Sequence, residues 1–154
     1  MNKDRVALDR RDFVAAGVAL ITTTALFGAT AKAGLPEVEA AIKEILGDRS
    51  AEEGRISLDL PEIAENGNTV PLTVEVDSPM TDDDHVSAVH IFADGNPLPN
   101  VAKMNFTSRS GEAVASTRIR LAKTQKIHAV AEMSDGSVFT AAREVKVTIG
   151  GCGG

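Results

Sequence analysis

The hydrophobic positions of the chain change their period once, and this change separates one helix from a series of strands. Between Leu35 and Leu46 apolar residues recur three and four positions apart, the spacing of one face of an α-helix. Pro36 suits the first turn of a helix, and Gly47 suits the position after its end. We therefore predict a helix over 35–46 whose apolar face packs on the sandwich or on a partner, through Val38, Ala41, Ile42, Ile45 and Leu46.

From Arg55 onward apolar and polar residues alternate, which is typical of strands with one buried face. Turn-forming residues separate the alternating segments. About seven short strands divided by turns predict a mainly β fold, an immunoglobulin-like β-sandwich with one N-terminal helix. The predicted strands span 56–60, 70–76, 86–93, 101–106, 113–121, 126–133 and 138–149, and the turn signals are Asn66-Gly67-Asn68, Asp94-Gly95-Asn96, Ser110-Gly111 and Asp135-Gly136.

Composition limits the size and the partners of this domain. The 154 residues suit one domain with a terminal extension. Hydrophobic residues make up 43% of the chain, but Trp and Tyr are absent and only five Phe occur, so aliphatic residues must build the core. The net charge of -6 argues against nucleic acid as a partner, because binding to phosphates requires a basic face.

Residues 1–33 have the three parts of an export signal in the expected order. A short charged head precedes the stretch 14–31, which has no charge but contains threonines and glycines and is too weakly apolar for a good membrane span. Ala31-Lys32-Ala33 offers small residues to a signal peptidase, with cleavage predicted before Gly34. We expect no membrane attachment after the signal is removed.

Arg10, Arg11 and Phe13 in the charged head resemble the twin-arginine export signal, although Asp9 and Val14 depart from its pattern. The resemblance implies export of the folded protein to the bacterial periplasm. Removal of residues 1–33 takes away five basic and three acidic residues and leaves a net charge of -8. A surface of this sign favours solubility and basic partner surfaces.

The chain ends in Gly150, Gly151, Cys152, Gly153 and Gly154, and Cys152 is its only cysteine. Alternation along 145–149 predicts that the sheet holds the chain as far as Ile149 and then releases a flexible arm over 150–154. An extended chain would carry Cys152 up to about 10 Å beyond that anchor. Glycine on both sides leaves the thiol nothing to pack against, so we expect it to be accessible to solvent.

Such a thiol is a handle rather than a catalytic nucleophile. Catalysis would require a base and an orienting group within hydrogen-bond reach, and a glycine arm cannot hold that geometry. The carboxylate of Gly154 disfavours the thiolate, so activation must come from another protein. An odd cysteine in an exported protein is also compatible with an intermolecular disulfide, which leaves a structural or adhesion module as the alternative.

No other constellation predicts chemistry. His85, His90 and His128 lack the spacing of a metal site, so we interpret them as structural. The acidic run 82–84 lacks the alternating ligands and the turn glycine of a calcium loop, so we interpret it as a solvated loop. No glycine-rich phosphate loop occurs. We therefore expect no resident cofactor and no metal.

The terminal Gly-Gly-Cys-Gly-Gly, with the twin-arginine-like head and a helix before an all-β domain, resembles the SoxY family of bacterial thiosulfate-oxidising systems. The resemblance implies a sulfur carrier, not an enzyme, that forms a heterodimer with a SoxZ-like subunit. It also implies that intermediates derived from thiosulfate are bound covalently to Cys152. A c-type haem enzyme would conjugate thiosulfate, a hydrolase would release sulfate and a sulfane dehydrogenase would oxidise the remaining persulfide.

Overall fold

The structure is a computed structural model that describes residues 34–151. Its helix, α2 (Leu35–Leu46), has the predicted bounds. The backbone amide of Gly34 donates a hydrogen bond of 2.9 Å to Oε2 of Glu37, which closes the first turn. Arg49 closes the other end, because its guanidinium donates to the carbonyls of Ile45 and Leu46. The helix thus begins and ends where local side chains satisfy its free backbone groups.

Nine strands and one 3-10 turn follow in the described part of the chain. The seven predicted strands are all present, with boundaries that differ by no more than a few residues. The elements are β1 (Ala51–Glu53), β2 (Ile56–Asp59), β3 (Ile63–Asn66), β4 (Val70–Val76), β5 (Val86–Ala93), β6 (Asn100–Asn105), η1 (Ser108–Ser110), β7 (Ala113–Ile119), β8 (Gln125–Met133) and β9 (Val138–Ile149).

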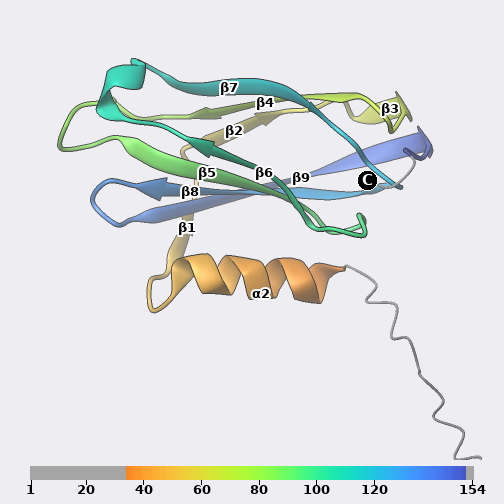
Figure 1. Ribbon diagram of the computed structural model, residues 1–154, viewed down its shortest axis with the longest axis horizontal. Coiled ribbons are helices and arrows are strands. Elements are labelled where there is room, and N and C mark those ends of the chain that lie inside the picture. Colours follow the sequence, from red (N-terminus) through yellow and green to blue (C-terminus); the bar gives the residue numbers. More distant parts are fainter. Residues whose placement is uncertain (1–33, 152–154) are drawn as a thin grey trace, which may run out of the picture. The chain divides into compact units, whose positions relative to one another are not determined.

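The strands form two sheets packed face to face, as the immunoglobulin-like prediction requires. The larger sheet has the order β1-β9-β8-β5-β6, with β3 also paired to β9, and the smaller sheet has the order β2-β4-β7. Figure 1 shows α2 across the outer face of the larger sheet and the smaller sheet on its other side. The described residues therefore form three layers, and the fold class predicted from the sequence is confirmed.

Two strands, β1 and β3, were not predicted. Both pair in parallel with β9, at opposite ends of that long strand: Ala51 lies opposite Val138, and Asn66 lies opposite Ile149. Neither segment shows a clear alternation, since every residue of β1 and three of four in β3 are exposed. Their pairing depends on the free edge of β9, a tertiary feature that local sequence does not reveal.

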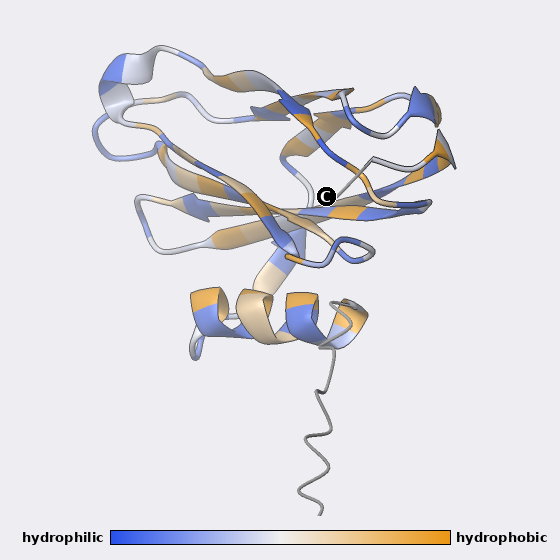
Figure 2. Ribbon diagram, turned by 45° about the vertical axis from the view of Figure 1, so that its right-hand side comes forward, coloured by the Kyte–Doolittle hydropathy of each residue, from blue (hydrophilic) through white to orange (hydrophobic). Residues whose placement is uncertain are grey.

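The main core lies between the two sheets, and a second cluster lies between α2 and the larger sheet. In the second cluster Val38, with no exposed surface, packs against Phe92, Val130 and Val138, as predicted for the apolar face of the helix. Because both faces of β5 and β8 are covered, these strands are buried almost throughout. Figure 2 shows hydrophobic and hydrophilic residues alternating along many of the strands.

Arg49 also ties the helix to the larger sheet. Its guanidinium lies 2.9 Å from Oε2 of Glu132 on β8, and Oε1 of the same carboxylate lies 3.0 Å from Nε2 of His90 on β5. Burial alone would raise the pKa of Glu132, but the hydrogen bonds and charges of Arg49 and His90 outweigh it and hold that pKa below its ordinary value. The ionised carboxylate therefore contributes to stability.

Candidate carrier site

The predicted site lies at the end of β9. Cys152, Gly153 and Gly154 fall outside the described residues, as do Arg10, Arg11 and Phe13 of the export signal, so these predictions stay predictions. Gly150 and Gly151 are described and show how the domain holds the segment before the cysteine. The end of β9 pairs with β3, and this brings the turn after Asn66 beside the tail (Figure 1).

Two backbone hydrogen bonds join the tail to two loops, and a third joins the loops to each other. The amide of Gly67 donates to the carbonyl of Ile149 (2.7 Å), and the carbonyl of Gly67 accepts from the amide of Leu121 (2.8 Å). The carbonyl of Leu121 in turn accepts from the amide of Gly151 (2.9 Å). Gly67, Leu121 and Gly151 are all buried. The residue directly before Cys152 is therefore part of the folded domain.

This geometry corrects the prediction that the chain is released after Ile149. Strand β9 does end there, and the Ile149 side chain is 66% exposed, but the backbone is held through Gly151. The sequence pattern was misleading because glycine serves two purposes: it permits flexibility, and it permits close approach of two backbones. Only the second applies to the described tail residues.

The absence of a Cβ is what allows the segments to meet. A Cβ on Gly67 would lie 2.2 Å from the carbonyl oxygen of Leu121, and a Cβ on Gly150 would lie 2.2 Å from that of Ala122. A Cβ on Gly151 would lie 2.7 Å from the carbonyl oxygen of Gly67. The obstacle in each case is backbone, which cannot rotate away as a side chain could. Three glycines are thus required for one packed contact.

A buried amide cluster holds the loop that receives the tail. Asn96, 2% exposed, donates to the carbonyl of Arg120 (2.8 Å), and its Oδ1 accepts from the amide of Ala122 (3.0 Å). Gln125, 5% exposed, donates to the same Oδ1 (2.9 Å) and accepts from the amide of Gly95 (2.7 Å). The β7–β8 loop is therefore fixed on both sides of Leu121.

Sequence reasoning missed Asn96 and Gln125. Asn96 lies in a correctly predicted turn, where a polar side chain is normally exposed to water. No local sequence signal distinguishes these two residues. The side chains of Asn96 and Gln125 come together beside Arg120 and Ala122 only when β5 and β8 are paired. Thr124 adds one more contact, because its Oγ1 accepts from the amide of Val147 at 2.9 Å.

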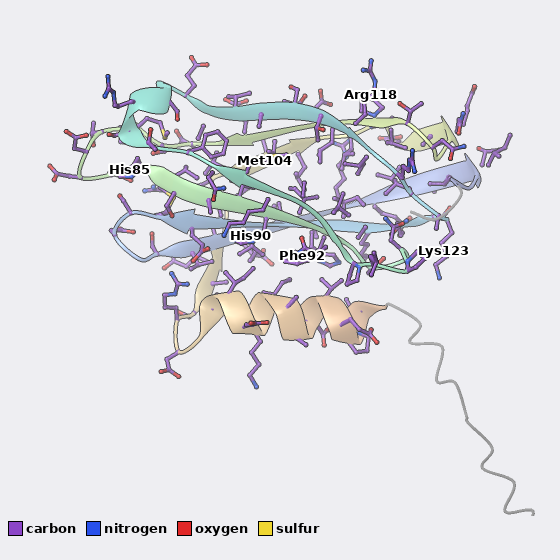
Figure 3. All side chains as sticks on the ribbon, viewed as in Figure 1. His85, His90, Phe92, Met104, Arg118 and Lys123 are labelled. Carbon is purple, nitrogen blue, oxygen red and sulfur yellow. The ribbon has the colours of Figure 1, made fainter. Side chains whose placement is uncertain are left out.

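The three histidines contact different partners, and His90 is the one that contacts Glu132. His85 contacts the Thr81 carbonyl through Nδ1 (3.0 Å), and His128 lies 3.6 Å from Asp94. In Figure 3 His85 is at one end of the sandwich, and Lys123, in the loop that receives the tail, is at the other. Within residues 34–151 no three potential ligands come together to hold a metal ion.

Comparison with known proteins identifies the family to which this chain is similar. The family described as "Sulfur oxidation protein SoxY" matches residues 42–152. The structure is also similar to that of the sulfur carrier protein SoxY from Chlorobium limicola f thiosulfatophilum, with 34% sequence identity and a TM-score of 0.59. That match covers 74% of this chain and 98% of the other. A comparison with curated protein sequences finds no significant match.

More distant structures share the fold alone. A superoxide reductase (neelaredoxin) from Ignicoccus hospitalis is 16% identical with a TM-score of 0.54, covering 61% of this chain and 80% of its own. A hypothetical protein from Pyrococcus horikoshii is 20% identical with a TM-score of 0.53, covering 68% of this chain and 99% of its own. At these identities neither similarity bears on chemistry.

The domain is an immunoglobulin-like sandwich of the kind found in sulfur carrier proteins. The chain belongs to the SoxY family of sulfur oxidation proteins. Within residues 34–151 no helix is both long and apolar enough to cross a bilayer.

Proposed function

We propose that the protein is a periplasmic carrier that holds thiosulfate-derived sulfur covalently on Cys152 and presents it to partner enzymes. The observation that carries the proposal is the family match, which extends to residue 152, the only cysteine of the chain. The terminal glycines on both sides of that cysteine support it, because they leave the thiol free of bulky neighbours.

The chemistry begins with one oxidation. The thiolate of Cys152 and the outer sulfur of thiosulfate form a sulfur–sulfur bond, and the two electrons released pass to a c-type haem enzyme. The product is a cysteine S-thiosulfonate. Attack of water on its terminal sulfur atom then releases sulfate and two protons and leaves a persulfide on the cysteine. A sulfane dehydrogenase oxidises that persulfide further.

Covalent attachment compensates for the small size of the substrate. Even the best small ligands gain only about 1.5 kcal/mol of binding free energy per heavy atom, so thiosulfate alone offers each enzyme little to recognise. A tether replaces that affinity with an effective concentration in roughly the mM range. Each partner needs to recognise only the carrier domain and its tail.

The described surroundings of the tail support a carrier rather than an enzyme. The groups that hold Gly151 are backbone atoms of Gly67 and Leu121, which can neither donate nor accept a proton in catalysis. The side chains of Asn96 and Gln125, which hold the supporting loop, are amides and do not titrate. The thiol is therefore activated by the enzymes that receive it.

Location and partners complete the proposal. Arg10, Arg11 and Phe13 direct export by the twin-arginine route to the periplasm. A SoxZ-like subunit forms the heterodimer, and the conjugating haem enzyme, the hydrolase and the sulfane dehydrogenase act on the same tail.

Intact mass spectrometry of the protein purified from thiosulfate-grown cells tests this function. The carrier is expected to bear adducts of sulfur or thiosulfate on Cys152 that a reductant removes, and Cys152→Ser should bear none. A protein that carries no adduct and is found only as a disulfide-linked dimer would instead support the structural or adhesion module.

A further inference from the structure

The tail is anchored at Gly151 by a single backbone hydrogen bond and by the close fit of two glycines. This contact determines how many residues lie between Cys152 and the nearest residue that is bound to the domain. With Gly151 bound, the Cα of Cys152 lies one residue, about 3.8 Å, beyond a fixed point. If the Gly151 amide leaves the Leu121 carbonyl, the nearest fixed point is the Gly67 bond to Ile149, and the reach of Cys152 grows to as much as about 10 Å.

We propose that Gly67 and Asn96 are positioning residues that form a latch, which withdraws the cysteine in one state and lets it extend in the other. The proposal rests on the proposed function for its purpose, because a carrier must both retain its cargo near the domain and deliver it into a partner. The latch itself is defined by contacts that are independent of sulfur chemistry.

Gly67 is the central residue of the latch. Its amide and its carbonyl bind two different segments, at Ile149 and Leu121, while the missing Cβ leaves room for Gly151. Asn96 acts one step further away, because it holds the carbonyl of Arg120 and the amide of Ala122 on either side of Leu121. The acceptor of the Gly151 amide is therefore fixed before the tail arrives.

The latch is also easy to open. The amide of Gly151 donates one backbone hydrogen bond, to the carbonyl of Leu121, and Gly151 lies beyond the end of β9. Strand β9 stays in place, because its pairing with β3 and β8 is complete by Ile149. A partner that binds the extended tail can open the latch without unfolding the domain.

Two substitutions test the latch from opposite sides. Gly67→Ala places a Cβ 2.2 Å from the Leu121 oxygen, and Gly151→Ala places one 2.7 Å from the Gly67 oxygen. Gly151→Ala alters only the end of the chain, so it should fold even if Gly67→Ala does not. Because both remove the same contact, the double variant should behave like either single variant.

A nitroxide label on the wild-type Cys152, the only cysteine, measures the result in the isolated mature protein. In both variants the lines of the nitroxide spectrum should be narrower, which reports faster motion of the label. Hydrogen exchange of the residue-151 amide should become about tenfold faster, because the amide loses its acceptor. Unchanged lines and unchanged exchange in both variants would overturn the latch.

Two controls make the result specific. Gly136→Ala strains a turn glycine with φ +87 that has open space around it, at the opposite end of β9, so it lowers stability without touching the latch. Gly153→Ala removes a tail glycine beyond the cysteine. Both control variants should retain the wild-type spectrum. If the label in either control were as mobile as in Gly67→Ala and Gly151→Ala, the proposal would be contradicted. The carrier function is tested separately by sulfur adducts on Cys152, so either idea can fail without the other.

Discussion

The amide of Gly151 lies 2.9 Å from the carbonyl oxygen of Leu121, so the domain holds the residue that immediately precedes the cysteine. Gly151 fits into a space where a Cβ would meet backbone, whereas Gly153 follows the thiol and lies outside the described residues. Experiments on the tail must treat the two positions separately.

Replacement of Cys152 by Ser should abolish thiosulfate-dependent sulfate formation in the reconstituted system. Serine cannot form the sulfur–sulfur bond to thiosulfate, but it is close to cysteine in size and should leave the fold and the proposed heterodimer intact. Sulfate release and gel filtration with the SoxZ-like subunit measure the two properties. Substantial sulfate formation by the variant would exclude the carrier role.

Gly153→Val should slow the use of the thiol by partner enzymes while leaving its reaction with a small alkylating reagent unchanged. A branched side chain next to the cysteine hinders entry into a narrow cleft but does not hinder a small molecule in solution. Rates of iodoacetamide labelling and of enzymatic conjugation are compared. If both rates fall by the same factor, the tail does not enter a narrow channel.

Gly151→Val is not an equivalent experiment, although the sequence alone would suggest it. Its Cβ would meet the Gly67 carbonyl, so the substitution both opens the latch and adds bulk beside the thiol. The comparison between positions 151 and 153 separates the two effects.

Much of this fold follows from local pattern. The apolar spacing of α2, with Pro36 and Gly47 at its ends, predicts its bounds, and the alternation of β4 predicts its buried face. Strands β1 and β3 could not be predicted, because they exist only through pairing with the free edge of β9. The family could be recognised in the sequence, because the terminal motif is short, local and specific.

The root of the tail could not be predicted, for a different physical reason. The sequence does not distinguish a glycine that is needed for close approach of two backbones from a glycine that is needed for flexibility. Only the position of the neighbouring backbone in the fold distinguishes them. The contact at Gly151 joins residues 67, 121 and 151, which are distant in sequence. Asn96 was hidden in the same way, since its burial depends on the loop that it holds.

Asn96→Ala should lower the free energy of unfolding by about 2 kcal/mol, because the Ala122 amide and the Arg120 carbonyl lose their buried partner. For a domain of this size the melting temperature should fall by roughly 5 to 15 °C. Differential scanning calorimetry measures both quantities. Asn105→Ala, at an exposed position at the end of β6, is the matched control and should change stability little. Equal losses in the two variants would contradict the role of Asn96.

Glu132→Gln should reduce the dependence of stability on acid pH. Arg49 and His90 hold the pKa of Glu132 below its ordinary value, so the folded state binds the proton more weakly than the unfolded state. The stability contributed by the carboxylate is fully present above the ordinary glutamate pKa of about 4.3 and is lost as the pH falls through the lower folded value.

Chemical denaturation between about pH 6 and pH 3 measures this contribution, since the window spans the ordinary carboxyl pKa. Wild-type protein should lose stability more steeply with acid than Glu132→Gln, because the glutamine has no proton to gain. Glu144→Gln is the matched control, because Glu144 is exposed on β9. It should keep the wild-type slope. If the slopes of wild type and Glu132→Gln coincide, the carboxylate does not couple α2 to the larger sheet through its charge.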